Sequence, residues 1–249
     1  ETDLILQLIN HPYFQRLRRI SQMGLSSLVY PGAHHTRFEH ALGAMHVMQK
    51  AIDVLLRKGV NISFEEREAM QIAILLHDIG HGPFSHATEE SLLQGIHHET
   101  ISLQVIALLN ESLGGQLDLA TKIFVGTYPR KFMHQLVSSQ IDVDRLDYLK
   151  RDSFYTGVTE GNINTNRILA TMNVKDEQLV FELKGVHSLE KFLLARRLMY
   201  WQVYLHKTGV AAELLLSNLM DYVSSMVVAG KLKEIPDDLL YFFSKQETA

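Results

Sequence analysis

The chain has 249 residues, which is long enough for one large domain with a sizeable core. Its 46% hydrophobic and 21% charged residues are typical of globular proteins, and its net charge of -4 argues against duplex nucleic acid as the main partner. Because cysteine is absent, disulfides, thiolate metal sites and thiol nucleophiles are excluded, whereas 13 histidines remain as metal ligands or bases. With no apolar run of membrane-spanning length and no signal-peptide pattern, we expect a cytoplasmic protein without a membrane partner.

Apolar residues recur at helical spacing along most of the chain. The expected helices are Thr2–Arg19 with a break at Pro12, His34–Lys50, Phe64–Ile79, Ser85–Leu93, His97–Leu109, Leu117–Val125, Lys131–Ser138, Ile141–Arg151, Ser188–Met226 with an interruption at Gly209, and a last helix from Pro236. Ser63 and Glu66 have the spacing of a capping box. Alternating residues over Asn173–Gly185, around a turn at Asp176–Glu177, predict a β-hairpin. The pattern predicts an all-α domain with one small hairpin.

The stretch 69–85 joins an apolar helix to a cluster of ionisable side chains. His77 stands beside Asp78 at the end of the apolar run, and Gly80 follows. Buried ionisable groups need a hydrogen-bonded partner or a cation, so the pair is either a satisfied core network or part of a metal site. If His40 and Asp144 come from two further helices, the set would suit one ion of Mn, Fe, Zn, Ni or Mg. Since neighbouring helical residues point about 100° apart, both His77 and Asp78 can reach that ion only if the helix end points at it.

Four sequence blocks carry a resemblance to a known family. In chain order they read FQRLRRISQMG, YPGAHHTRFEHALG, LLHDIGHGPFSH and IDVDRLDYLKRD. They resemble the HD-domain phosphohydrolase superfamily and, more narrowly, its deoxynucleoside triphosphate triphosphohydrolase branch. The resemblance implies a single HD-type helical bundle over residues 1–249, with a core of about 14–207 and a helical extension over 210–249. Because members of that branch are longer, we expect a C-terminal portion to be absent here.

The resemblance also implies roles for individual residues. The implied metal ligands are His40, His77, Asp78 and Asp144, and the implied catalytic group is His81, His86, Glu89 and His98. The implied substrate contacts are Gln22, Arg37, Arg145, Tyr148, Asp152, Arg196, Tyr204 and Lys207. Glu89 stands where close relatives often carry Asp, and its three-residue spacing from His86 would let the two side chains touch on a helix.

The implied activity is metal-dependent hydrolysis of a deoxynucleoside triphosphate to a deoxynucleoside and triphosphate. Asp152 with Gln22 would hold the sugar 3′-hydroxyl, and Tyr148 would leave no room for a 2′-hydroxyl. The branch further implies a homo-oligomer, a dimer or a tetramer, and an activating nucleotide near Asn10–Arg18. Asn10 replaces the acidic residue that would read a guanine edge, which argues against a guanine-specific activator.

Other interpretations remain open at this stage. The chain could be another HD-type enzyme, such as a 5′-nucleotidase, a cyclic-nucleotide phosphodiesterase or a guanosine tetraphosphate hydrolase, or a nucleotide-sensing HD domain without catalysis. His81, His86 and His98 could serve as hydrogen-bonding neighbours of the metal ligands. Arg196, Lys207 and Tyr204 lie in an aromatic-rich stretch, where stacking, surface charge or core packing competes with a substrate role.

Overall fold

The computed structural model describes residues 2–84, 96–232, 235–236, 240 and 243. Its helices are α1 (Asp3–Asn10), α2 (Pro12–Gln15), α3 (Arg37–Arg57), α4 (Phe64–Leu76), α6 (His98–Ser112), α7 (Asp118–Phe124), α8 (Lys131–Val137), α9 (Val143–Thr156), α10 (Thr165–Thr171), α11 (Val186–Met199) and α12 (Lys207–Val228). Short 3₁₀ turns, η1 to η4, cover Arg16–Arg19, Gly24–Leu28, Thr159–Gly161 and Leu183–Gly185, and a π-helical turn, η5, covers Tyr200–Tyr204. Two strands, β1 (Met172–Lys175) and β2 (Gln178–Phe181), form an antiparallel pair. The predicted helical fold with one small hairpin is therefore confirmed.

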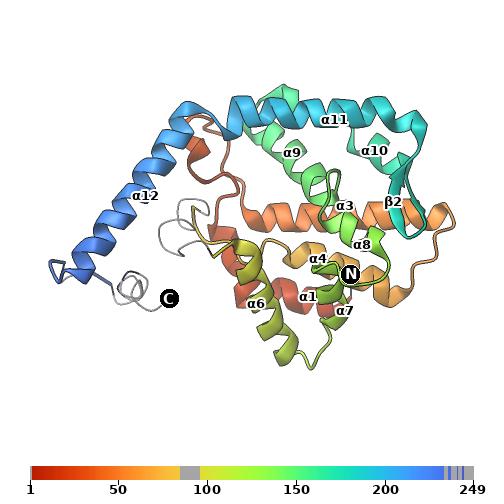
Figure 1. The fold of residues 1–249 in the computed structure, drawn as a ribbon, viewed down its shortest axis with the longest axis horizontal. Helices are drawn as coiled ribbons and strands as arrows, with labels where there is room; N and C mark the ends of the chain where they lie inside the picture. Colours follow the sequence, from red (N-terminus) through yellow and green to blue (C-terminus); the bar gives the residue numbers. More distant parts are fainter. Residues whose placement is uncertain (1, 85–95, 233–234, 237–239, 241–242, 244–249) are drawn as a thin grey trace.

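Helix α3 lies at the centre of the bundle and packs against both α4 and α9 (Figure 1). Its inward side chains, Ala41, Ala44, Met48, Ile52 and Leu55, follow a spacing of three or four residues and are almost completely buried. This burial removes the apolar stripe from water and holds the three helices together. The functional side chains of α3 are thereby fixed relative to those of its two neighbours.

Capping boxes set the start of α3 and α4. The hydroxyl of Thr36 accepts from the amide of Glu39, and the Glu39 carboxylate accepts from the amide of Thr36 at 2.6 Å. Ser63 and Glu66 make the same reciprocal pair at the start of α4, as the sequence predicts. Helix α3 thus starts three residues after the expected His34, because the cap, and not the apolar pattern, decides where a helix begins.

Helix α4 ends at Leu76, three residues before the predicted end, and a tight turn follows. The Gly80 amide donates to the hydroxyl of Ser102 on α6 at 2.9 Å, and that hydroxyl donates to the carbonyl of His77 at 2.9 Å. A Cβ atom on Gly80 would lie 2.3 Å from the Ser102 amide nitrogen, so only glycine fits. This contact positions His77 and Asp78 beyond the helix end.

The C-terminal half differs from the prediction in two places. Helix α10 lies between Asp152 and the hairpin, where no helix was predicted. The expected long helix divides at Leu205–His206 instead of at Gly209, because the His206 side chain caps α12 by accepting from the amide of Thr208. The predicted last helix from Pro236 and the predicted helix Ser85–Leu93 lie largely or wholly outside the described residues.

Figure 1 shows α11 running across the bundle beside α9, whereas α12 leads away from it. The first part of α12 contacts the 3₁₀ turn η2, which lies near the N-terminal end of the chain. None of the helices in the described part of the chain combines the length and the apolar character needed to cross a lipid bilayer.

Candidate functional site

Four side chains from three separate parts of the chain converge, as the sequence predicts. We call His40, His77, Asp78 and Asp144 the His/Asp cluster. The Nε2 atom of His40 lies 3.3 Å from Nε2 of His77 and 3.0 Å from Oδ1 of Asp144. Nε2 of His77 lies 3.4 Å from the same Asp144 oxygen and 3.5 Å from Oδ1 of Asp78. His40 comes from α3, the His77–Asp78 pair from the turn after α4, and Asp144 from the first turn of α9.

The donor set fits a divalent cation. Nδ1 of His40 points at Oδ2 of Asp147 at 2.8 Å, and Nδ1 of His77 points at the carbonyl of Ile74 at 2.6 Å. Each Nδ1 therefore carries the proton in the neutral ring, and the lone pair of each Nε2 faces the other across 3.3 Å. Two facing lone pairs flanked by carboxylates need a positive charge between them. His40, His77 and Asp78 could each supply a ligand atom to one metal ion.

The carboxylates of the cluster attract positive charge. Burial alone would lower the pKa of His40, but hydrogen bonds to Asp144 and Asp147 outweigh it and raise the pKa to about 10. Burial opposes ionisation of Asp144, yet the two imidazoles hold the pKa of that carboxyl well below its usual range. The carboxylates therefore favour positive charge beside them, either as a proton on His40 or as a divalent cation bound at Nε2 in place of that proton.

Asp147 supports the cluster from behind. Its carboxylate accepts the bond from His40 and also two bonds, each 2.9 Å long, from Nε and Nη2 of Arg151 one helical turn later. A Cβ atom at Gly43 would lie 2.2 Å from an Asp147 oxygen, so the close approach of α3 to α9 requires glycine there. The sequence analysis gave Asp147 no role, although its spacing of three from Asp144 was an available signal.

A second group of ionisable side chains adjoins the cluster through Asp78. Arg37 donates from Nη1 to Oδ2 of Asp78 at 2.6 Å, and Nε2 of His81 lies 3.2 Å from Oδ1. The ring of His81 stacks on that of His98 with 3.8 Å between centroids. Burial, aided by the charges of Arg37 and His98, lowers the pKa of His81 to about 4 despite the opposing effect of Asp78. His81 is therefore neutral at pH 7.

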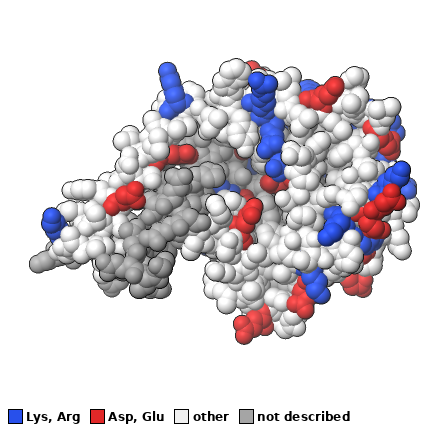
Figure 2. All heavy atoms as spheres, viewed as in Figure 1, with Lys and Arg blue, Asp and Glu red and all other residues white. Residues whose placement is uncertain are grey.

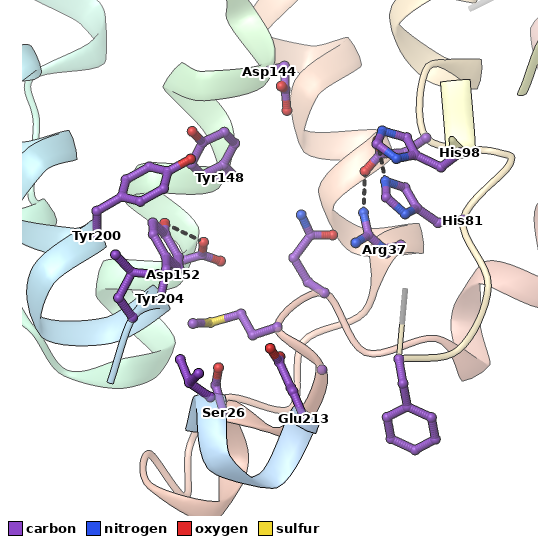
Figure 3. Close-up of a pocket in the computed structure, with 17 residues that line it drawn as sticks. Ser26, Arg37, His81, His98, Asp144, Tyr148, Asp152, Tyr200, Tyr204 and Glu213 are labelled. Carbon is purple, nitrogen blue, oxygen red and sulfur yellow. Dashed lines mark hydrogen bonds and ion pairs between the residues drawn. The ribbon is translucent and has the colours of Figure 1, made fainter. Parts of the chain in front are cut away.

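The cluster lies at one end of a cavity of about 540 Å³ (Figure 3). This volume is within the range of small-molecule sites. Figure 3 shows Asp144 at one end, Tyr148, Asp152 and Tyr204 along one side with His81 and Arg37 on the side facing them, and Ser26 with Glu213 at the opposite end. Of the predicted substrate contacts, the cavity wall contains Gln22, Arg37, Tyr148, Asp152 and Tyr204.

Asp152 is held by two donors at the side of the cavity. The hydroxyl of Tyr204 donates to Oδ2 at 2.7 Å, and Nε2 of His35 lies 2.7 Å from Oδ1. The His35 ring is completely buried and stacks on Tyr155 with 4.5 Å between centroids. The sequence analysis missed His35, because the exposed His34 beside it gives no signal to tell the two apart.

The remaining predicted contacts occupy different places. Arg145 donates to Asp142, the N-cap residue of α9, at 2.6 Å, and the Arg196 guanidinium lies 5.6 Å from the centre of the Tyr200 ring. Lys207 is exposed at the start of α12 and is not part of the cavity wall that the described residues form. His86 and Glu89 lie outside the described residues.

The segment Asn10–Arg18, predicted to bind an activating nucleotide, is bonded both within itself and to the rest of the bundle. Arg18 donates from Nε to the Gln15 side chain at 2.7 Å, and its guanidinium lies 3.6 Å from the centre of the Phe38 ring. Arg16 instead reaches inward and donates to the carbonyls of Ile79 and His81, in the turn that carries the cluster.

Figure 2 shows Lys and Arg interspersed with Asp and Glu on the visible face, so the described atoms there form no broad basic patch.

Comparisons with known proteins identify the domain that contains this site. Residues 37–152 match the HD domain, and residues 163–248 match the HD associated region. The first match begins at Arg37 and ends at Asp152, so it contains the whole His/Asp cluster.

Several relatives extend over nearly the whole chain. The uncharacterized protein YwfO of Bacillus subtilis is 39% identical over 87% of this chain and 51% of its own length. The Dictyostelium discoideum homolog of the deoxynucleoside triphosphate triphosphohydrolase SAMHD1 is 30% identical over 96% of this chain and 50% of its own length. Human SAMHD1 is 27% identical over 92% of this chain and 44% of its own length. The chain thus spans about half the length of these curated relatives.

A solved structure gives the same fold. The crystal structure of a phosphohydrolase from Bacteroides thetaiotaomicron has 53% sequence identity and a TM-score of 0.95, and the match covers 98% of this chain and 60% of that one. The chain therefore belongs to the HD-domain phosphohydrolase family and has relatives among the SAMHD1 deoxynucleoside triphosphate triphosphohydrolases.

Proposed function

We propose that the protein hydrolyses deoxynucleoside triphosphates to a deoxynucleoside and triphosphate, with one divalent ion held by the His/Asp cluster. The observation that carries the proposal is the pairing of this cluster with a cavity that also presents the Asp152–Tyr204 pair. The cluster would receive the phosphates, and the Asp152–Tyr204 pair would receive the sugar. The relatives named as deoxynucleoside triphosphate triphosphohydrolases support this choice of substrate.

In this proposal, water attacks the α-phosphorus and the bond from phosphorus to the 5′ oxygen breaks. The bound ion would supply positive charge for the phosphates and lower the pKa of water. Arg37 lines the cavity and would bring its positive charge to phosphate oxygens. Neutral His81 would donate a hydrogen bond, since its low pKa makes it a poor source of protons. We assign the proton that the 5′ oxygen needs to His86 with Glu89, two residues outside the described part of the chain.

We assign the sugar to the side of the cavity. The Asp152 carboxylate already accepts from His35 and Tyr204 and has lone pairs left for a 3′-hydroxyl, with Gln22 nearby in the same wall. The ring of Tyr148 contacts that of Tyr204 edge-on at 6.3 Å between centroids, which holds it beside the sugar position. Its bulk would exclude a 2′-hydroxyl, so we expect ribonucleotides to react much more slowly.

Product analysis tests the proposal. The purified protein is incubated with each deoxynucleoside triphosphate and Mn²⁺ or Mg²⁺, and the products are separated by ion-exchange chromatography. We expect deoxynucleoside and triphosphate from the natural protein, no turnover from Asp144→Ala, and unchanged turnover from Asp221→Asn, an exposed charge on α12. Release of a nucleoside monophosphate or of orthophosphate would contradict the proposed reaction.

A further inference from the structure

The end of the cavity opposite the His/Asp cluster carries a carboxylate that the proposed reaction does not use. Glu213 is half-buried on α12 and lines the cavity, with Ser26 beside it at the same end (Figure 3). Its carboxylate lies close to η2, since a Cβ atom added to Gly24 would lie 3.4 Å from Oε1 of Glu213. Gly24 has φ +52°, so the chain already uses a conformation that favours glycine at this contact.

The surrounding wall suits a planar aromatic group. Val210 lies one helical turn before Glu213 and therefore on the same face of α12, and both line the cavity. Met23, next to Gly24, and Leu205, just before α12, also line it. This end of the cavity thus combines apolar side chains with one carboxylate and one hydroxyl, the pattern of a site that packs against a ring and reads its polar edge.

The order of groups along the cavity matches the order of groups in a nucleotide. Asp144 of the cluster lies at one end, the Asp152–Tyr204 pair lies along the side, and Glu213 lies at the other end. If phosphates and sugar occupy the first two positions, the base reaches the third. This step rests on the proposed function.

We propose that Glu213 selects the base of the nucleotide and favours bases that present N–H donors. An ionised carboxylate only accepts hydrogen bonds. Guanine presents two adjacent donors, which can bind both carboxylate oxygens, and adenine and cytosine each present an exocyclic amine. Thymine places a carbonyl oxygen on either side of its single N–H, and these oxygens face the negative charge. The expected order of preference is therefore dGTP first, dATP and dCTP next, and dTTP last.

The test compares kcat/KM for the four deoxynucleoside triphosphates in the natural protein and in Glu213→Gln. One good bidentate contact corresponds to about a tenfold preference, so we expect dGTP to exceed dTTP by about tenfold or more. Glutamine keeps the shape of the side chain but adds an amide N–H, which can donate a hydrogen bond to a thymine carbonyl. The ratio of kcat/KM for dGTP to kcat/KM for dTTP should therefore fall toward one. Asp221→Asn, which removes a charge from the same helix outside the cavity wall, should leave the ratio unchanged.

Binding measurements separate this inference from the proposed reaction. Calorimetric titration with dGTP and with dTTP in the presence of Ca²⁺ gives the preference without turnover. If triphosphate is released but all four nucleotides react and bind alike, or if Glu213→Gln keeps the natural ratio, the role of Glu213 is wrong and the proposed function stands. If no nucleotide is hydrolysed but dGTP binds more tightly than dTTP only when Glu213 is present, the role of Glu213 stands and the proposed function is wrong.

A second variant covers the case in which Glu213→Gln fails to fold. Glu213→Asp keeps the charge but withdraws it by one methylene group, so the preference for dGTP over dTTP should shrink while its direction is kept. A preference of the natural size in Glu213→Asp, with the thermal midpoint unchanged, would contradict a contact between this carboxylate and the base.

Discussion

His40 divides its two ring nitrogens between two tasks. Nε2 faces His77 and Asp144, whereas Nδ1 donates to Asp147. The bond from Nδ1 fixes both the tautomer and the ring orientation, and metal-binding histidines commonly depend on such a partner. Asp147 is therefore the side chain that would orient His40 toward a bound ion without touching that ion itself.

His35 has the same kind of supporting role toward Asp152, and this leads to a prediction. Replacing His35 by Phe removes one of the two donors to the Asp152 carboxylate but keeps a ring against Tyr155. We expect KM for a deoxynucleoside triphosphate to rise about tenfold, since the sugar contact is loosened, with a smaller change in kcat. Steady-state kinetics measure both parameters.

The control for this prediction is the neighbouring residue. His34 is exposed, so His34→Phe should leave both parameters close to those of the natural protein. If kcat of His35→Phe fell about tenfold while KM stayed unchanged, Asp152 would act on the chemical step and not on the binding of the sugar.

At the scale of secondary structure, the start of α4 does more than begin a helix. Glu66 closes the capping box with Ser63 and also accepts from the Tyr128 hydroxyl at 2.9 Å and from Nη1 of Arg130 at 2.9 Å. Arg130 bonds in turn to Glu177 in the hairpin turn. One carboxylate thus links the first turn of α4 to the segment before α8 and, through Arg130, to β1 and β2.

The network of Glu66 predicts how stability changes with pH. Burial opposes its ionisation, but bonds from Ser63, Tyr128 and Arg130 prevail and lower its pKa below the usual 4.5. Because the folded pKa lies below the unfolded one, the contribution is present above about pH 4.5 and is lost as the pH falls through the folded value. In urea denaturation, Glu66→Gln should be less stable than the natural protein at pH 7 and should lose less stability on acidification.

Glu68→Gln provides the comparison, since Glu68 belongs to the same helix but takes no part in these bonds. It should follow the pH dependence of the natural protein. If Glu66→Gln lost stability on acidification as steeply as the natural protein, other carboxylates would account for the pH dependence of stability below about pH 4.5.

At the scale of the whole molecule, the His/Asp cluster joins parts of the chain that are far apart in sequence. His40 lies on α3, His77 and Asp78 follow α4, and Asp144 opens α9. The same helices pack through their apolar faces. The core and the cluster therefore hold the same elements together, one by burial and one by charge.

A bound ion should accordingly stabilise the fold. A ligand that binds only the folded state at about 100 times its Kd adds ~2.7 kcal/mol, which corresponds to about 5 to 10 °C in Tm for a chain of this size. Chelation with EDTA should lower Tm by this amount, and addition of Mn²⁺ should restore it, as followed by differential scanning calorimetry. Asp144→Ala should lose the response to both treatments.

If the natural protein and Asp144→Ala responded equally to chelation, the ion would be bound elsewhere, and the cluster would be a hydrogen-bonded network of the core. Elemental analysis of both proteins after purification measures the same difference without heating.

Local patterns were sufficient for much of this protein. The apolar spacing predicted most of the helices, the Ser63–Glu66 spacing predicted a cap, and alternation around Asp176–Glu177 predicted the hairpin. The resemblance of the four sequence blocks to the HD-domain family also pointed to the His/Asp cluster. Each of these features depends on residues that lie close together in the sequence, or on a motif contained within one element. Such features can therefore be predicted from the sequence alone.

Tertiary structure alone decided the rest. It ended α4 at Leu76 because Gly80 packs against Ser102, and it selected His35 over the adjacent His34 by burying one ring beside Asp152. It also brought Glu213 to the cavity opposite the cluster, although 69 residues (213 − 144) separate it from the nearest cluster member in sequence. Such contacts join distant segments through packing, and no local spacing encodes which of several similar side chains will face a shared cavity.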